Sequence, residues 1–334
     1  MTNRKKIISF VLISLLIVTS MLLLCSCVDD YEEYHGDGVY AILYRNGTAR
    51  VYAFDKALDA GWYDAQICIV PSIIEDDGKT YTVTAFGGDD DFSKALVSDG
   101  GHAKEIVIPE TVTEIELDYY SLSDTFDYLE RFTVDSDNPQ YKSENGVLYN
   151  KDGSRLIMYP PAKKDTTFVI PSELAQIDSV QYNYCNKYIK EIEVEKGNAF
   201  FKVCDNALYS IDGETLVYVP YGHSENLALP DGIVTIDYCA LRYANIVNLY
   251  VPQRIFRDEQ NDYQFILNVV YDSRRNLSDN HPFRYVRNVY FYDGELPRFL
   301  NNINLPYTEF HFGVSREAFW ETVGGSVESD GNLA

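Results

Sequence analysis

The sequence predicts a β-rich solenoid, a right-handed coil of short parallel strands with inserted β-hairpins. The first observation is a motif that occurs twice at an offset of 60 residues, in residues 138–160 and 198–220. The second is a series of short segments in which two apolar residues flank a third residue, a pattern typical of a strand with one face in a core. Because no such segment can bury its apolar pair alone, successive coils must stack on one another.

The duplicated motif predicts a β-hairpin in each copy, inserted between two coils. In both copies an Asp-Gly dipeptide separates two strand-like runs, and this dipeptide tolerates the positive φ angles of a tight turn. The matching positions are Asn138, Tyr141, Leu148, Tyr149, Asp152, Gly153, Leu156 and Pro160, which recur as Asn198, Phe201, Leu208, Tyr209, Asp212, Gly213, Leu216 and Pro220.

The apolar pairs define nine expected rungs of the solenoid, over residues 67–313. Their first members are 39, 26, 36, 24, 35, 22, 40 and 21 residues apart, so the bare repeat has 21–26 residues and the longer intervals hold insertions, including an irregular one at 253–287. One short strand per repeat of this length is the spacing of leucine-rich repeats. The pairs are Ile67/Ile69, Ile106/Ile108, Phe132/Val134, Phe168/Ile170, Ile192/Val194, Leu227/Leu229, Leu249/Val251, Val289/Phe291 and Phe310/Phe312.

Three segments resemble the repeat of BspA-like leucine-rich-repeat proteins, which occur on bacterial surfaces. Residues 108–115, 170–177 and 229–236 begin with Ile-Pro or Leu-Pro and end with Ile, similar to the IPxxVxxI segment of that family. The resemblance covers roughly residues 38–320, although Tyr119-Tyr120 stands where the family usually carries Ala-Phe. It implies a leucine-rich-repeat fold and, as partners, host proteins, matrix components or other cells.

The N-terminus predicts export and lipid anchoring. Three basic residues precede an uncharged apolar run at 7–24, and the run ends in Leu24-Cys25-Ser26-Cys27, which matches the bacterial lipobox. We expect residues 1–26 to be a lipoprotein signal peptide and Cys27 to be acylated, so that the chain meets the membrane only through its lipidated N-terminus. An uncleaved membrane-spanning anchor is the alternative. Either way the rest of the chain lies outside the cytoplasmic membrane, and a bacterial cell-surface location is expected.

The two ends of the solenoid are expected to carry different caps. Residues 27–37 are acidic and lack an apolar period, which predicts a solvated tether. Residues 38–66 alternate apolar and polar side chains on either side of Asn46-Gly47, which predicts an N-terminal β-hairpin cap. In the C-terminal cap and tail, residues 314–334, an N-cap at Ser315 followed by apolar residues predicts a short helix.

Composition restricts the classes of partner. The chain has 51 acidic and 28 basic residues and a formal net charge of −23, which argues against nucleic-acid binding. The five histidines are scattered and the acidic clusters lack the ligand spacing of a calcium loop, so we expect no metal site and no cofactor. The arginines of the 253–287 insertion are expected to pair with acidic coils, in preference to forming an anion site.

Alternate residues of each rung face away from the core and form two outward columns. Neither column places two carboxylates, or a nucleophile and a base, on neighbouring rungs, so we do not expect an enzyme. Tyr and Asn suit recognition of a protein loop or a sugar, although they are also tolerated strand-surface residues. The candidate binding face, with its two tyrosines as anchors, consists of Asn226, Asn248, Tyr250, Asn288 and Tyr290.

These observations predict an exported, lipid-anchored cell-surface protein that binds or adheres to a protein or glycan ligand through the strand face of its solenoid. A structural or envelope-assembly protein that interacts with partners of its own cell is the first alternative. A carbohydrate-active enzyme is the second.

Overall fold

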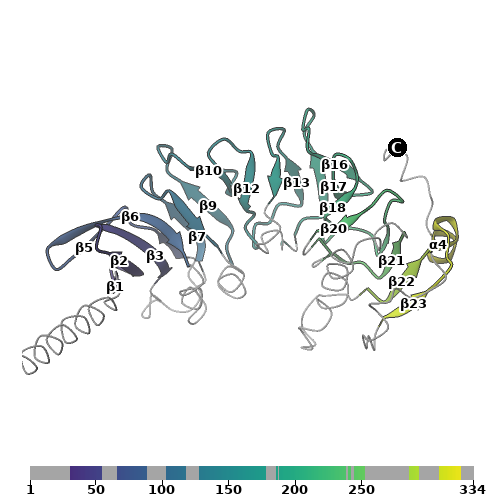
Figure 1. Ribbon diagram of the computed structural model, residues 1–334, viewed down its shortest axis with the longest axis horizontal. Coiled ribbons are helices and arrows are strands. Elements are labelled where there is room, and N and C mark those ends of the chain that lie inside the picture. The colour runs from purple at the N-terminus through teal and green to yellow at the C-terminus, as the bar shows by residue number, and fades with distance from the viewer. Residues whose placement is uncertain are drawn as a thin grey trace, which may run out of the picture.

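The computed structural model describes residues 31–54, 66–88, 103–117, 128–177, 186, 188–237, 240–241, 244–252, 286–292 and 308–324. These parts are rich in β-strands, which follow one another along an arc from the N-terminal sheet to a single helix near the C-terminus (Figure 1). The predictions for the signal peptide, for Cys27 and for most of the 253–287 insertion lie outside the described residues. No helix within the described ranges is long and apolar enough to cross a membrane.

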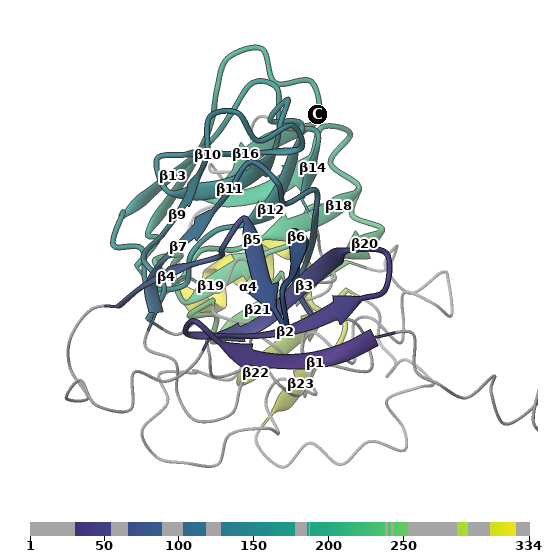
Figure 2. The same cartoon turned by 90° about the vertical axis from the view of Figure 1, so that its left-hand side faces the viewer.

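The N-terminal end is a six-stranded sheet rather than a single hairpin. It lies in front of the rungs when the arc is viewed from this end (Figure 2). Around Asn46-Gly47 two of its strands form the expected hairpin, with φ 84° at Gly47. The sheet order is β1 (Tyr31–Gly36), β2 (Val39–Tyr44), β3 (Thr48–Phe54), β6 (Lys79–Gly87) and β5 (Ile73–Asp76), and β8 (Glu114–Glu116) also pairs with β6.

The prediction of a solvated tether at 27–37 is wrong for residues 31–36, which form β1 and pair antiparallel with β2. The turn between them is Asp37-Gly38, with φ angles of 52° and 79°. This dipeptide is the same hairpin signal that was recognised elsewhere in the chain. A charged strand at the edge of a sheet leaves its acidic side chains in water, so it shows no apolar period.

Arg50 of β3 joins the cap sheet to the first coil. Its side chain is buried and forms ion pairs with Glu114 and with Glu116, the latter at 2.9 Å. It also donates a hydrogen bond to the carbonyl of Gly87 at 3.5 Å. Because both acids lie on β8, the pairs hold that strand against the cap.

The nine expected rungs correspond to nine described strands, which form three parallel sheets. The sheet orders are β4-β7-β9, β13-β15 and β19-β21-β22-β23. From β7 to β22 the predicted apolar pairs face the core, as shown by Ile192, which is 4% exposed, beside the exposed Glu193. The strands are β4 (Gln66–Ile69), β7 (Ala103–Ile108), β9 (Arg131–Val134), β13 (Thr167–Ile170), β15 (Glu191–Val194), β19 (Asn226–Ala228), β21 (Asn248–Val251), β22 (Asn288–Phe291) and β23 (Glu309–His311).

The first rung has the opposite orientation to the predicted one. A bulge between Gln66 and Ile67 shifts the register, so that Cys68 lies opposite Ile106 and packs against the core. Ile67 and Ile69 are therefore 61% and 62% exposed. Burial raises the pKa of the Cys68 thiol to about 11. The prediction failed here because all three residues are apolar, and a period of two does not then say which face is inside.

Each duplicated motif forms a three-stranded antiparallel unit, one strand more than the predicted hairpin. Its last strand pairs in parallel with a short strand of the next coil. Both units interrupt the ladder of rungs, the first between β9 and β13 and the second between β15 and β19. The first unit consists of β10 (Tyr141–Glu144), β11 (Val147–Asn150) and β12 (Arg155–Met158), and β12 pairs with β14 (Gln176–Ile177) of the next coil. The second consists of β16 (Phe201–Cys204), β17 (Ala207–Ser210) and β18 (Thr215–Tyr218), and β18 pairs with β20 (Thr235–Ile236).

The C-terminal helix α4 (Arg316–Val323) has the predicted N-cap. The Ser315 hydroxyl accepts a hydrogen bond from the backbone N–H of Ala318 at 3.2 Å, and Gly324 ends the helix in the left-handed region with φ 80°. Phe319 and Trp320 are its buried residues. They determine where the helix lies, and therefore which part of the strand face stays open.

Candidate binding surface

The structure brings the five predicted binding residues together on neighbouring rungs of one sheet. The three asparagines occupy one column, since Asn226 pairs with Asn248 and Asn248 with Asn288. Tyr250 and Tyr290 are partners in the adjacent column. The predicted columns are therefore correct in register. The side-chain contacts decide whether they can meet a ligand.

The asparagine column is a hydrogen-bonded ladder. The amide of Asn288 donates to Asn248, and the amide of Asn248 donates to Asn226, each at 2.7 Å. At one end the Asn226 amide donates to the carbonyl of Val323 in α4 at 3.5 Å. At the other end His311 Nε2 lies 3.3 Å from the Asn288 carbonyl oxygen, which can only accept. Much of the hydrogen-bonding capacity of this column is thus used within the protein.

The two tyrosines do not lie on an open surface. Tyr250 is 1% exposed and Tyr290 is 6% exposed, because α4 packs over them. The Phe319 ring lies 5.8 Å from that of Tyr250 and 5.1 Å from that of Tyr290, measured between ring centroids. The prediction that they anchor a partner from an exposed face is wrong. Their outward column is the docking site for α4.

The burial of Tyr250 and Tyr290 raises the pKa of both hydroxyls, and one feature of the sequence indicates this burial. Desolvation raises the pKa of Tyr250 to about 12, and it also raises that of Tyr290. The apolar pair Phe319-Trp320, which needs an apolar surface to pack against, was the clue that sequence reasoning missed. Arg316 of the same helix donates to the carbonyl of Ala228 at 3.2 Å, which fixes α4 on β19.

The outward face of the first five rungs, β4 to β15, is the part of the strand face on which apolar side chains are exposed. Ile67 and Ile69 open this face on β4, and Val169 on β13 is 42% exposed. Between them β7 and β9 present polar groups that bond across the rungs. The Thr133 hydroxyl donates to Glu105 at 2.5 Å, and Arg131 Nε lies 3.6 Å from the same carboxylate. We call this face, β4 to β15, the open face.

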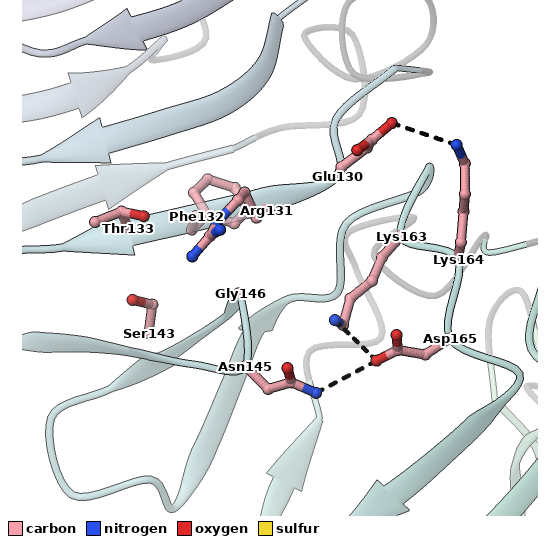
Figure 3. Close-up of a pocket in the computed structure, with 10 residues that line it drawn as sticks. All are labelled: Glu130, Arg131, Phe132, Thr133, Ser143, Asn145, Gly146, Lys163, Lys164 and Asp165. Carbon is pink, nitrogen blue, oxygen red and sulfur yellow. Dashed lines mark hydrogen bonds and ion pairs between the residues drawn. The ribbon is translucent and has the colours of Figure 1, made fainter.

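A pocket of about 410 Å³ lies where the first hairpin unit interrupts the ladder. Figure 3 shows the residues that line it, which come from β9 and the residue before it, from β10 and the turn between β10 and β11, and from the segment that precedes β13. They are Glu130, Arg131, Phe132, Thr133, Ser143, Asn145, Gly146, Lys163, Lys164 and Asp165. We call it the gap pocket.

The gap pocket has three cations and two carboxylates in its lining, within a chain of strongly negative charge. Lys163 Nζ lies 2.8 Å from Asp165, which also accepts a hydrogen bond from the Asn145 amide at 3.3 Å. Lys164 Nζ lies 3.7 Å from Glu130. Each carboxylate of the lining thus has a cation beside it, an arrangement that suits recognition better than proton transfer.

Within the ranges that the structure covers, no group of three or more His, Cys, Asp and Glu residues is placed to hold a metal ion. His223 is the one buried histidine of these ranges, and its Nε2 lies 4.0 Å from Asp205.

Comparisons with known proteins find structural likeness alone. No protein-family model matches the sequence, and no curated protein matches it. Solved structures that match include the pneumococcal vaccine antigen PcpA, at 14% identity and a TM-score of 0.33, with 66% of this chain and 64% of that chain covered. The solved structures that match also include bacterial leucine-rich-repeat proteins.

One of these is a leucine-rich-repeat protein from Eubacterium ventriosum, at 18% identity and a TM-score of 0.30, with 67% of this chain and 80% of that chain covered. Another is a leucine-rich cell surface protein from Faecalibacterium prausnitzii, at 13% identity and a TM-score of 0.26, with 70% and 92% covered. They are of the class that the sequence motifs resemble.

Proposed function

We propose that the chain is a leucine-rich-repeat solenoid that is exported, lipid-anchored through Cys27 and displayed at the bacterial cell surface, where it binds a protein or glycan ligand. The observation that supports binding is the open face. It exposes Ile67, Ile69 and Val169, while the same side of the ladder beyond β19 is covered by α4. Exposed apolar groups that are surrounded by polar ones are typical of interaction surfaces. We therefore place the ligand site at the opposite end of the ladder from the two tyrosines.

The chemistry of the open face fits recognition. Apolar area supplies the affinity of an interface, and Thr133, Glu105 and Glu193 supply a polar rim. Strands that are hydrogen-bonded to neighbouring rungs, as β4 is to β7, lose little conformational freedom when a ligand binds, so binding is not weakened by ordering of the backbone.

Replacing Ile67 and Ile69 together with aspartate is expected to weaken ligand binding by at least about tenfold, or about 1.4 kcal/mol. Both side chains are mostly exposed, so the melting temperature should change little. Residues 28–334 would first be applied to arrays of glycans and surface proteins, and the affinity of each hit would then be measured by surface plasmon resonance. Ligands from the bacterium itself on the same array would reveal an envelope-assembly role.

Ile73→Asp is the matched control, because Ile73 is 50% exposed but lies on β5 of the cap sheet. It should leave the affinity unchanged. Equal affinity of the Ile67/Ile69 variant and the unaltered protein would remove the open face as the ligand site, and the lack of any hit would reject the binding function.

Lipid anchoring is a separate expectation from Leu24-Cys25-Ser26-Cys27. Mass spectrometry of the N-terminal peptide from isolated membranes should show Cys27 as the first residue and carrying a diacylglyceryl group. Two acyl chains hold a protein stably on a bilayer, whereas one is marginal. A Cys27→Ser variant should accumulate in uncleaved form. An unmodified Cys27, or retention of residues 1–24 in the unaltered protein, would contradict the proposed anchor.

A further inference from the structure

The two hairpin units meet the ladder differently, and the gap pocket lies at the first of them. In the second unit the Asn206 side chain accepts a hydrogen bond from Ile192 N at 3.0 Å and donates to the carbonyl of Lys190 at 2.7 Å. The equivalent residue of the first unit, 60 positions earlier, is Gly146. It has no side chain, and its carbonyl accepts the N–H of Phe132 at 2.9 Å instead. The backbone of Gly146 thus makes the contact with β9 that the Asn206 side chain makes with β15, and the gap pocket lies beside this contact.

Hydrogen-bond donors line the gap pocket, and the backbone of one of them, Lys163, is held in place. The carbonyl of Lys163 accepts a hydrogen bond from the buried Asn186 amide, which fixes the backbone of this lysine. Lys163 is 9% exposed, and Asp165 is the one partner of its ammonium among the described residues, so two of its three N–H donors are available. The terminal nitrogens of Arg131 have no hydrogen-bond partner in the described parts of the chain.

We propose that the gap pocket binds a sugar acid, that is, a sugar residue that carries one carboxylate. Arg131, Lys163 and Lys164 supply the positive charge for the carboxylate, and a guanidinium can hold it with two parallel hydrogen bonds. Figure 3 shows Ser143 on the side of Thr133 and Asn145 turned toward Asp165. The Ser143 hydroxyl accepts the N–H of Val134 at 3.1 Å, so its proton and the Asn145 amide oxygen can still bond to ring hydroxyls. The volume of about 410 Å³ lies in the range of small-molecule sites.

The charges of the lining favour a single carboxylate over a dense polyanion. Glu130 and Asp165 lie beside the cations and would repel a phosphate chain or a nucleic acid, as would the net charge of −23. A sugar acid carries one carboxylate, which would lie among the cations of the pocket. Its neutral ring hydroxyls would donate hydrogen bonds to Glu130 and Asp165. Phe132, the one aromatic residue of the lining, is fully buried, so the lining offers no exposed aromatic ring for stacking.

Galacturonic acid, with galactose as its neutral counterpart, is the probe. Isothermal titration of the purified chain should show galacturonic acid binding at least about tenfold more tightly than galactose, with an affinity that falls as salt is added. Gly146→Asn should abolish the binding by filling the pocket. Asparagine suits this position because Asn206 adopts the same left-handed conformation, φ 54° against 79° at Gly146. Its Cβ would lie 2.9 Å from the Cβ of Arg131 and 3.4 Å from its Cα, so the backbone of the turn or of β9 must shift to accept it, and the second variant below avoids this shift.

Arg131→Gln with Lys164→Gln is the second variant, and it does not depend on repacking, because both side chains are exposed, at 58% and 70%. It should weaken galacturonic acid binding at least about tenfold. The control, Lys79→Gln with Lys196→Gln, removes the same charge from exposed residues elsewhere and should have no effect.

Four results would overturn the proposal: no binding of galacturonic acid by the unaltered chain, equal binding of galactose, displacement by inorganic phosphate at equal concentration, or unchanged binding in both pocket variants. An N-acetylglutamate peptide that binds while the sugar acid does not would assign the pocket to a protein ligand instead. The Ile67/Ile69 variant keeps the pocket, so its galacturonic acid binding should be normal. Failure of the open face and failure of the gap pocket are therefore distinguishable.

Discussion

Replacing Asn138 with alanine is expected to lower the free energy of unfolding by about 3 kcal/mol or more, although the change removes a single polar side chain. Asn138 is completely buried and all four of its hydrogen-bonding positions are used. Its amide nitrogen donates to the carbonyls of Pro109 and Val112 at 2.7 and 2.8 Å. Its oxygen accepts from the backbone N–H groups of Gln140 and Tyr141 at 2.9 and 2.8 Å.

The size of the effect follows from what is left behind. The alanine variant would remove one hydrogen bond from each of two carbonyls of one coil and two N–H groups of the next, and the Pro109 carbonyl would keep only the N–H of Val112 at 3.4 Å. Each orphaned group that stays away from water costs about 1–3 kcal/mol. Because the four groups belong to two coils, Asn138 links neighbouring turns of the ladder. Urea unfolding followed by circular dichroism would measure the loss.

Two further variants test this explanation. Asn138→Asp keeps the size and the acceptor but loses the donor, so it should be at least as destabilising at neutral pH, since a carboxylate would face two carbonyl oxygens. Gln140→Ala changes an exposed neighbour and should alter the stability by less than about 0.5 kcal/mol. An Asn138→Ala loss as small as that of Gln140→Ala would show that the inter-coil bonds add no net stability.

The duplicated motif contains the same device a second time. Asn198 donates to Pro171 and Leu174 at 2.7 and 2.8 Å, and accepts from Phe200 and Phe201 at 2.8 and 2.9 Å. The sequence already paired Asn138 with Asn198, but it did not indicate that Asn138 is buried or that Asn198 is partly buried, because asparagine is usually a surface or turn residue.

Local pattern was sufficient for the elements whose stabilising contacts are close in sequence. The period-two apolar pairs correctly predicted the inward faces of β7 to β22, and the Asp-Gly turns predicted the two hairpin units. Ser315 predicted the start of α4. In each case the residues that define the element lie within a few positions of one another.

Apart from β1, which pairs with the neighbouring β2 across Asp37-Gly38, the failures have a different cause in common, since each depended on a contact between distant segments. The face of β4 is set by its pairing with β7, more than 30 positions away, and β1 is visible only as a partner of β2. The binding face failed for the same reason. Its tyrosines lie more than 20 positions before the helix that covers them, and neither segment alone shows that they meet. The gap pocket likewise arises from three segments that only the fold brings together.

The helix contact leads to the second large effect. Changing both Tyr250 and Tyr290 to alanine is expected to release α4 from the ladder and to lower the stability by about 3 kcal/mol or more. A surface role for the two tyrosines would have predicted an almost unchanged melting temperature, whereas their burial predicts a lower one. Removing both rings leaves Phe319, which is fully buried, without the surface on which it packs.

Tryptophan fluorescence reports this release directly. The chain has two tryptophans, Trp62 and Trp320, and Trp320 lies in α4 at 6% exposure. In a Trp62→Phe background, the double tyrosine variant should show red-shifted emission, easier quenching by acrylamide and faster proteolysis near residue 315. Tyr292→Ala is the control, because Tyr292 follows β22 but is 56% exposed, and it should change none of these properties. If the double variant kept a blue-shifted, protected Trp320, α4 would be held by its hydrogen bonds to Asn226 and Ala228 rather than by the two aromatic rings.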